Sequence, residues 1–188
     1  MARLPIIVPE EAKGKARSLL ADVQKKLGLV PNMTRVMANS PATLEAYIQF
    51  SSALEGGSLD AKCRERIALE TAEANRCEYC LSAHSAIGKM VGLDDSEILD
   101  SRQAHARDAK ASAALRFSRL ILEEHGAVGA ADIGAARKGG LTDSEIAEVV
   151  GLTVLNIFTN YFNTAFQVDI DFPHPQRVAR RLRKFKLV

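Results

Sequence analysis

The residues from Thr142 to about Gln167 constrain the fold of this chain more than any other stretch. They predict one helix of about 26 residues, which at 1.5 Å per residue is about 39 Å long. Apolar side chains occur almost all round its projection, a pattern typical of a central helix that its neighbours bury. Because helical periodicity dominates the rest of the chain and strand patterns are nearly absent, we predict an all-α fold.

A series of shorter helices is predicted before the long one. Proline, serine or acidic residues mark their starts, and glycine or asparagine marks most of their ends. The predicted segments are 10–27, 31–39, 42–54, 60–75 and 77–91, followed by 112–125 and a short weak helix within 126–140. Two pairs, Asp94 with Glu97 and Thr142 with Glu145, have the spacing of a capping box. They indicate either two similar helix starts or an old duplication.

The chain is long enough to form one domain with its own core. We expect a single all-α domain over 1–188, with its core at about 42–168. The N-terminal helix and a basic C-terminal helix are expected as extensions of this core. Six basic residues lie between Arg177 and Lys186, on a helix that we expect to face solvent or to pack in an oligomer.

Composition argues against several classes of protein. The apolar fraction of 47% and the charged fraction of 26% are ordinary for a soluble protein, and a net charge of +2 does not predict a nucleic-acid partner. The apolar stretch near the N-terminus is broken by Pro5 and lacks the features of a signal peptide. No apolar run reaches the roughly 18 residues of a membrane helix. We therefore expect a cytoplasmic protein without a membrane or nucleic-acid partner.

The residues most suited to redox chemistry lie in the stretch from Cys77 to His84. It holds two of the three cysteines and one of the four histidines of the chain. On a helical projection Cys77, Cys80 and His84 fall within about 60° of arc, so that they share one face. Two thiols that can reach each other, with an imidazole one turn beyond the second, form a redox constellation.

Four interpretations of these residues compete. A c-type haem site needs a histidine directly after the second cysteine, where Leu81 stands. An iron–sulfur cluster usually needs four thiolates, and the chain has three cysteines. A zinc site would need a fourth ligand, and the candidates form no second paired motif: Cys63, His105, His125 and His174. A dithiol redox pair needs only what is present, so no metal and no cofactor are expected.

Either cysteine could be the nucleophile. The break at Asn75-Arg76 places Cys77 near a helix N-terminus, where free amides favour the thiolate. His84, four residues after Cys80, can instead take the proton of Cys80. A thiolate that attacks the O–O bond of a hydroperoxide becomes a sulfenic acid, which a second thiol captures as a disulfide. A partner dithiol must then reduce that disulfide.

The helix before this motif carries Glu65, twelve residues before Cys77. A short turn joins the two helices, so Glu65 can fold back beside the cysteine face and hold His84 or a water in a proton relay. The alternative is a surface acid paired with an arginine or lysine.

A stripe of amides follows one line of the long helix, formed by Asn156, Asn160, Asn163 and Gln167. A buried amide without a partner costs about 1–3 kcal/mol. The stripe must therefore face a polar pocket, polar groups of another helix or a seam between subunits. We favour the seam over the wall of a substrate pocket.

The pattern Glu-x11-Cys-x-Tyr-Cys-x3-His, from Glu65 to His84, resembles the alkylhydroperoxidase D-like, carboxymuconolactone decarboxylase-like family, and most closely its peroxidase-related members. The helix around Asn160 and Asn163 extends the similarity. The resemblance implies an oligomeric all-α fold, as trimers or hexamers, with a central helical hairpin and a hydroperoxide-reducing dithiol. It also implies that Cys80 is peroxidatic, that Cys77 is the more exposed, resolving thiol, and that Glu65 and His84 relay the proton.

One position departs from the best-known members, which have histidine where this chain has Tyr79. A phenol with a pKa near 10 is a poor base at neutral pH, so the relay would be shorter and the turnover weaker. Tyr79 is interpreted either as a packing residue or as a relay or pocket hydroxyl. The third cysteine, Cys63, matches no motif position and is expected to be a small buried residue.

The sequence therefore predicts a thiol-dependent, antioxidant peroxidase that reduces hydrogen peroxide or small organic hydroperoxides through Cys77 and Cys80. A dithiol protein or a small thiol would supply the electrons. Two alternatives are a carboxymuconolactone decarboxylase-like lyase and a non-enzymatic oligomeric module that responds to redox state.

Overall fold

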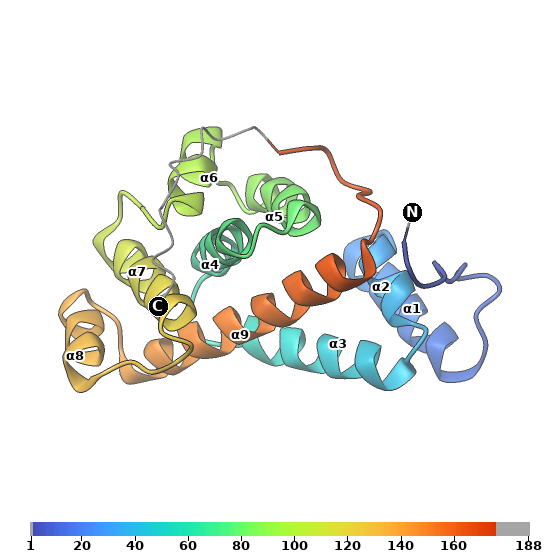
Figure 1. Cartoon of the computed structure of the whole chain (residues 1–188), viewed down its shortest axis with the longest axis horizontal. Coiled ribbons are helices and arrows are strands. Elements are labelled where there is room, and N and C mark those ends of the chain that lie inside the picture. The colour runs from blue at the N-terminus through green and yellow to red at the C-terminus, as the bar shows by residue number, and fades with distance from the viewer. Residues whose placement is uncertain (1, 176–188) are drawn as a thin grey trace, which may run out of the picture.

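The computed structural model describes residues 2–175, and this part of the chain holds nine helices and no strand (Figure 1). The all-α prediction is confirmed. The helices are α1 (Gly14–Leu27), α2 (Asn32–Met37), α3 (Pro41–Glu55), α4 (Ala61–Ala74), α5 (Glu78–Met90), α6 (Asp95–Arg102), α7 (Ala109–Glu123), α8 (Ala130–Lys138) and α9 (Asp143–Phe166). The predicted basic helix from Arg177 to Lys186 lies outside the described residues.

Most helices begin where the sequence predicts a cap. The side chain of Asp60 accepts a hydrogen bond from the Cys63 amide at the start of α4. Both predicted capping boxes are present, at the starts of α6 and α9. The start of α1 differs from the prediction, because residues 9–11 form a turn and the helix begins four residues later, at Gly14.

The long helix α9 is buried on one side only. It crosses the molecule beside α3, with α4 and α5 over its other flank (Figure 1). Its inner face is enclosed, but four large apolar side chains of its outer face are exposed: Val150, Val154, Phe158 and Tyr161. The prediction of a helix buried on all sides is wrong for this face. The enclosed helix is instead α4, which packs against α5, α6, α7 and α9.

The two larger apolar cores of the described residues both include side chains of α4. One joins α4 to α7, α8 and α9, and the other joins α5 to α1, α2 and the segment after α9. Glu70 of α4, which is fully buried, forms an ion pair with the partly buried Arg119 of α7. Ser118 donates to Glu70 at 3.0 Å and lies 2.9 Å from Thr153 of α9, so polar contacts tie all three helices together.

The segment after α9 turns back over α2 and α5. The side chain of Asp171 accepts from the Asn32 amide at 2.7 Å, and Phe172 packs edge-on against Tyr79 with ring centroids 5.9 Å apart. At the other end of the chain, the Arg3 amide donates to the Phe166 carbonyl at 2.7 Å. No helix among the described residues is long and apolar enough to cross a membrane.

Candidate active site

The turn between α4 and α5 places Cys77 at a helix N-terminus, as predicted. Arg76 adopts a left-handed conformation with φ of 57°, and the Cys77 amide donates back to the Ala72 carbonyl at 3.0 Å. Cys77 is the N-cap of α5, and its sulfur accepts from the Cys80 amide at 3.3 Å. The cysteine pair therefore occupies the first turn of α5, where free amides and the helix dipole favour negative charge.

Cys77 and Cys80 are joined as a disulfide, with their Cα atoms 5.3 Å apart. Each is only 2% exposed, so the expectation that Cys77 is the more exposed thiol is wrong for this structure. Both cysteines belong to an apolar core that also includes Leu20 of α1 and Val36 of α2. Cys80 lines a cavity of about 320 Å³, and Cys77 is not among the residues that line it.

Glu65 reaches back to the cysteine face, as the hairpin predicts. Its Oε2 lies 2.8 Å from Nδ1 of His84, and both side chains are partly buried. The alternative of a surface acid paired with arginine is not observed, since Arg66 pairs with Glu97. With Nδ1 held by the carboxylate, the second ring nitrogen of His84 remains for a partner in the cavity.

The amide stripe of α9 faces the interior of this chain. Asn156, Asn160 and Asn163 are at most 5% exposed, so the seam that we favoured from the sequence is wrong for these three residues. Only Gln167, the left-handed C-cap of α9, is exposed. Asn156 and Asn163 line the cavity, while the Oδ1 of Asn160 accepts from Asn75 at 3.0 Å and fastens α9 to the turn before Cys77.

Asn163 contacts the sulfur of Cys80. Its Nδ2 donates to Sγ of Cys80 at 3.3 Å and to Sδ of Met33 at 3.2 Å. Its Oδ1 is buried and has no hydrogen-bond partner among the described residues. A buried acceptor without a partner is costly, and here it belongs to a residue of the cavity wall that already contacts Cys80.

Tyr79 is held away from the histidine. Its Oη accepts from the Met33 amide at 3.2 Å and also hydrogen-bonds Asp171. Burial is the largest cause that raises the pKa of Tyr79 far above its ordinary value, so the phenol stays neutral. Tyr79 lines the cavity, but within the described part of the chain it has no hydrogen bond to Glu65 or His84, so its contacts support packing rather than a relay.

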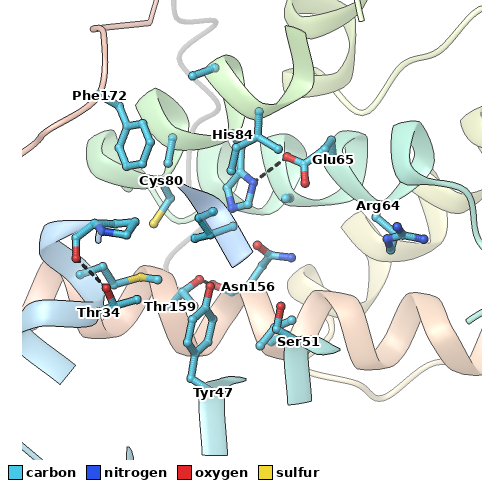
Figure 2. A pocket seen from close by; sticks show the side chains of 18 of the residues that line it. Thr34, Tyr47, Ser51, Arg64, Glu65, Cys80, His84, Asn156, Thr159 and Phe172 are labelled. Atoms are coloured by element: carbon cyan, nitrogen blue, oxygen red, sulfur yellow. Dashed lines mark hydrogen bonds and ion pairs between the residues drawn. The ribbon is translucent and has the colours of Figure 1, made fainter. Parts of the chain in front are cut away.

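The cavity has a volume of about 320 Å³ and lies between α5 and α9, with walls from α1 to α4 and from Phe172. Figure 2 shows Cys80, His84 and Glu65 along one wall, with Tyr47 and Thr159 opposite. Sequence reasoning missed Tyr47, Ser51 and Thr159, which carry hydroxyls on the lining. Burial raises the pKa of Tyr47 to about 12. Tyr47 lies at a position on α3 that is typical of a core residue, so the sequence around it does not identify it as a cavity residue.

Cys63 is a buried thiol of the second core, as predicted, and desolvation raises its pKa to about 11. Its surroundings do not include the cavity. Across residues 2–175, no three His, Cys, Asp or Glu side chains are grouped so that they could hold a metal ion.

Comparison with known proteins gives a family for the central part of the chain. Residues 41–124, from α3 to α7, match the model of the carboxymuconolactone decarboxylase family. A Haemophilus influenzae protein without an assigned function is 52% identical over 46 residues. That match covers 24% of this chain and spans only 41% of the Haemophilus protein.

Solved structures share the fold over most of its length. An AhpD-core, peroxidase-related protein from Ralstonia eutropha is 24% identical with a TM-score of 0.82, and the match covers 90% of this chain and 92% of that one. A peroxidase-related protein from Silicibacter is 24% identical with a TM-score of 0.79, covering 89% and 91%. The debrominase Bmp8, bound to 2,3,4-tribromopyrrole, is 15% identical with a TM-score of 0.73, covering 91% and 94%.

Proposed function

Because this chain belongs, through residues 41–124, to the carboxymuconolactone decarboxylase family and has the fold of AhpD-like proteins, we propose that it is a thiol-dependent peroxidase. One observation carries the proposal. The sulfur of Cys80, the amide of Asn163 and the Glu65–His84 pair all line one cavity. This set supplies a nucleophile, a donor that stabilises its charge and a proton carrier.

The cycle begins with the reduced pair. His84 takes the proton of the Cys80 thiol, and the thiolate is stabilised by the Asn163 amide and by the start of α5. The thiolate attacks one oxygen of the hydroperoxide: the S–O bond forms, the O–O bond breaks, and His84 protonates the leaving alkoxide. The products are an alcohol, or water from hydrogen peroxide, and Cys80 sulfenic acid.

The Cys77 thiol then attacks the sulfur of the sulfenic acid. The S–S bond forms, the S–O bond breaks, and water leaves with the proton of Cys77. Their Cα separation of 5.3 Å allows this bond. A dithiol protein or a small thiol supplies the two electrons that restore the reduced pair and is itself oxidised to a disulfide.

The free acceptor of Asn163 gives this residue a second role in the proposal. A hydroperoxide carries one O–H donor, and Oδ1 of Asn163 is the buried acceptor of the cavity wall that lacks a partner. A hydrogen bond from the substrate to this oxygen would hold the O–O bond beside Cys80. Glu65 acts through His84, whose ring orientation it fixes, and is a positioning residue.

We also propose that the protein is a homo-oligomer, a trimer or a hexamer, that works in the cytoplasm. The exposed apolar side chains of α9 support this assembly, together with Phe50 of α3, which lies beside α9 at Gly151. Exposed apolar surface of this kind is unusual on a monomer and commonly marks an interface.

The test is a titration of free thiols in the reduced protein before and after one equivalent of hydroperoxide. The wild type should lose two thiols, Cys77→Ser should hold a sulfenic acid at Cys80, and Cys80→Ser should not react. Cys63→Ser serves as the matched control and should still lose two thiols. If peroxide causes no loss of free thiols in the wild type, the peroxidase hypothesis is wrong. The lyase and the redox-responsive module would then be the remaining hypotheses.

A further inference from the structure

The lining of the cavity extends along two helices, α5 and α9. On α5 the lining residues share one broad helical face: Tyr79, Cys80, Ala83, His84, Ala86, Ile87 and Met90. From Cys80 to Met90 this face spans ten residues. Ten residues of helix measure about 15 Å. The lining face of α9 runs from Leu152 to Asn163, about 16 Å. A volume of about 320 Å³ along this length describes a channel that suits a chain better than a broad ring system.

The two ends of the channel differ in chemistry. At one end Asn163 contacts Cys80, and Phe172 closes the wall. Toward the C-terminal end of α5 the lining includes Ile87 and Met90, and Arg64 of α4 also belongs to it. Figure 2 shows Cys80 and Phe172 on one side, the Glu65–His84 pair in the middle and Arg64 on the other side. A ligand that fills the channel therefore meets Cys80 at one end, His84 and apolar side chains along its length, and a guanidinium at the other end.

Among the charged side chains that line the cavity, Arg64 forms no ion pair within the described residues. Lys26 pairs with Glu55 at 2.6 Å, and Glu65 is held by His84 at 2.8 Å. Arg64 donates through one nitrogen to the Leu59 carbonyl, and no carboxylate of residues 2–175 lies within ion-pair distance of it. A partly buried guanidinium with free N–H groups is a site for a carboxylate, which it binds through two parallel hydrogen bonds.

We propose that the channel binds chain-like carboxylates, and that the substrate is an organic hydroperoxide of this class. Its carboxylate pairs with Arg64, its chain lies between α5 and α9, and its peroxide group reaches Cys80. The reaction leaves the carboxylate unchanged and reduces the hydroperoxide to an alcohol. This inference rests on the proposed peroxidase function and deepens it, but its binding part can be tested without turnover.

The binding test compares dodecanoate with methyl dodecanoate on the oxidised protein, by displacement of a fluorescent fatty-acid probe. The acid should bind at least about tenfold more tightly than the ester, the weak end of what hydrogen bonding to a charged group contributes. Arg64→Gln should remove this preference, because it keeps a donor for the Leu59 carbonyl and loses the charge.

Lys62→Gln is the matched control, since it removes a positive charge two residues away on the same helix and outside the channel lining. It should keep the preference for the acid. Equal affinity for acid and ester in the wild type, or a preference that survives in Arg64→Gln, would overturn the carboxylate site.

The kinetic test compares a hydroperoxide of linoleic acid with the hydroperoxide of its methyl ester, and uses hydrogen peroxide as a small reference substrate. The acid should have about tenfold higher kcat/KM than the ester in the wild type, and a ratio near one in Arg64→Gln. If acid and ester react equally, the substrate assignment is wrong and the peroxidase stands. If dodecanoate binds with the Arg64-dependent preference but no hydroperoxide oxidises the thiols, the peroxidase is wrong and the carboxylate site stands.

Discussion

Replacing Asn163 by leucine should raise the pKa of the Cys80 thiol. The amide donates one hydrogen bond to this sulfur at 3.3 Å, from a side chain that is 3% exposed. A hydrogen bond to a charged group contributes about 1.5–3 kcal/mol. Because one pKa unit corresponds to about 1.4 kcal/mol, loss of the bond to a thiolate should raise the pKa by about one unit, taking the weak end of that range for sulfur. Below that pKa, the thiolate population falls about tenfold.

The assay is the rate of alkylation by iodoacetamide as a function of pH, on reduced protein with Cys77 and Cys63 replaced by serine. The midpoint for Cys80 should move to higher pH in Asn163→Leu, and the rate at neutral pH should fall about tenfold. Asn160→Leu is the matched control, because it removes a buried amide one turn earlier that bonds Asn75 rather than sulfur. An unchanged midpoint in Asn163→Leu, or an equal shift in Asn160→Leu, would refute this role of Asn163.

Three further predictions concern other parts of the molecule. Glu65→Gln should lower the kcat of hydroperoxide reduction by about 10- to 100-fold with an unchanged circular dichroism spectrum, because His84 loses the carboxylate that orients it. Tyr161→Glu places a charge on the exposed face of α9, and light scattering should show a smaller assembly than that of the wild type. Burial raises the pKa of Cys63 from 9.0 to about 11, so the unfolded chain loses this proton first. Stability should therefore fall between about pH 9 and 11, by about 2–3 kcal/mol from this thiol, and Cys63→Ala should reduce that fall in urea unfolding.

For each of these three predictions, a specific outcome would contradict the reasoning. Full kcat in Glu65→Gln would mean that His84 needs no orienting partner. An unchanged mass in Tyr161→Glu would exclude this face from the interface. An identical loss of stability at alkaline pH in the wild type and in Cys63→Ala would assign the effect to other groups.

Features that depend on neighbouring residues could be predicted from the sequence. The helix start at Cys77 follows from the break at Asn75-Arg76, and the two capping boxes follow from residues three apart. The approach of Glu65 to His84 was also predictable, because two helices joined by a short turn usually pack against each other.

Features that depend on distant segments could not be predicted. Cys77 is buried in an apolar core to which α1, α2 and the segment after α9 contribute, and nothing near Cys77 in the sequence predicts that packing. The helical projection correctly put the amides of α9 on one line, but it could not say whether that line faces a cavity or another subunit. The same limit applies to Tyr161, because an apolar pattern does not show whether its partner belongs to the same chain.

The position of the disulfide within a single turn of α5 decides what oxidation can do to the rest of the molecule. The bridge joins residues three apart and ties no two helices together. Its formation therefore leaves the packing between helices without a new constraint, and its reduction releases none. Such a bond can form and break in every catalytic cycle without changing how the helices pack. This suits a catalytic disulfide better than a regulatory disulfide that acts through a conformational change.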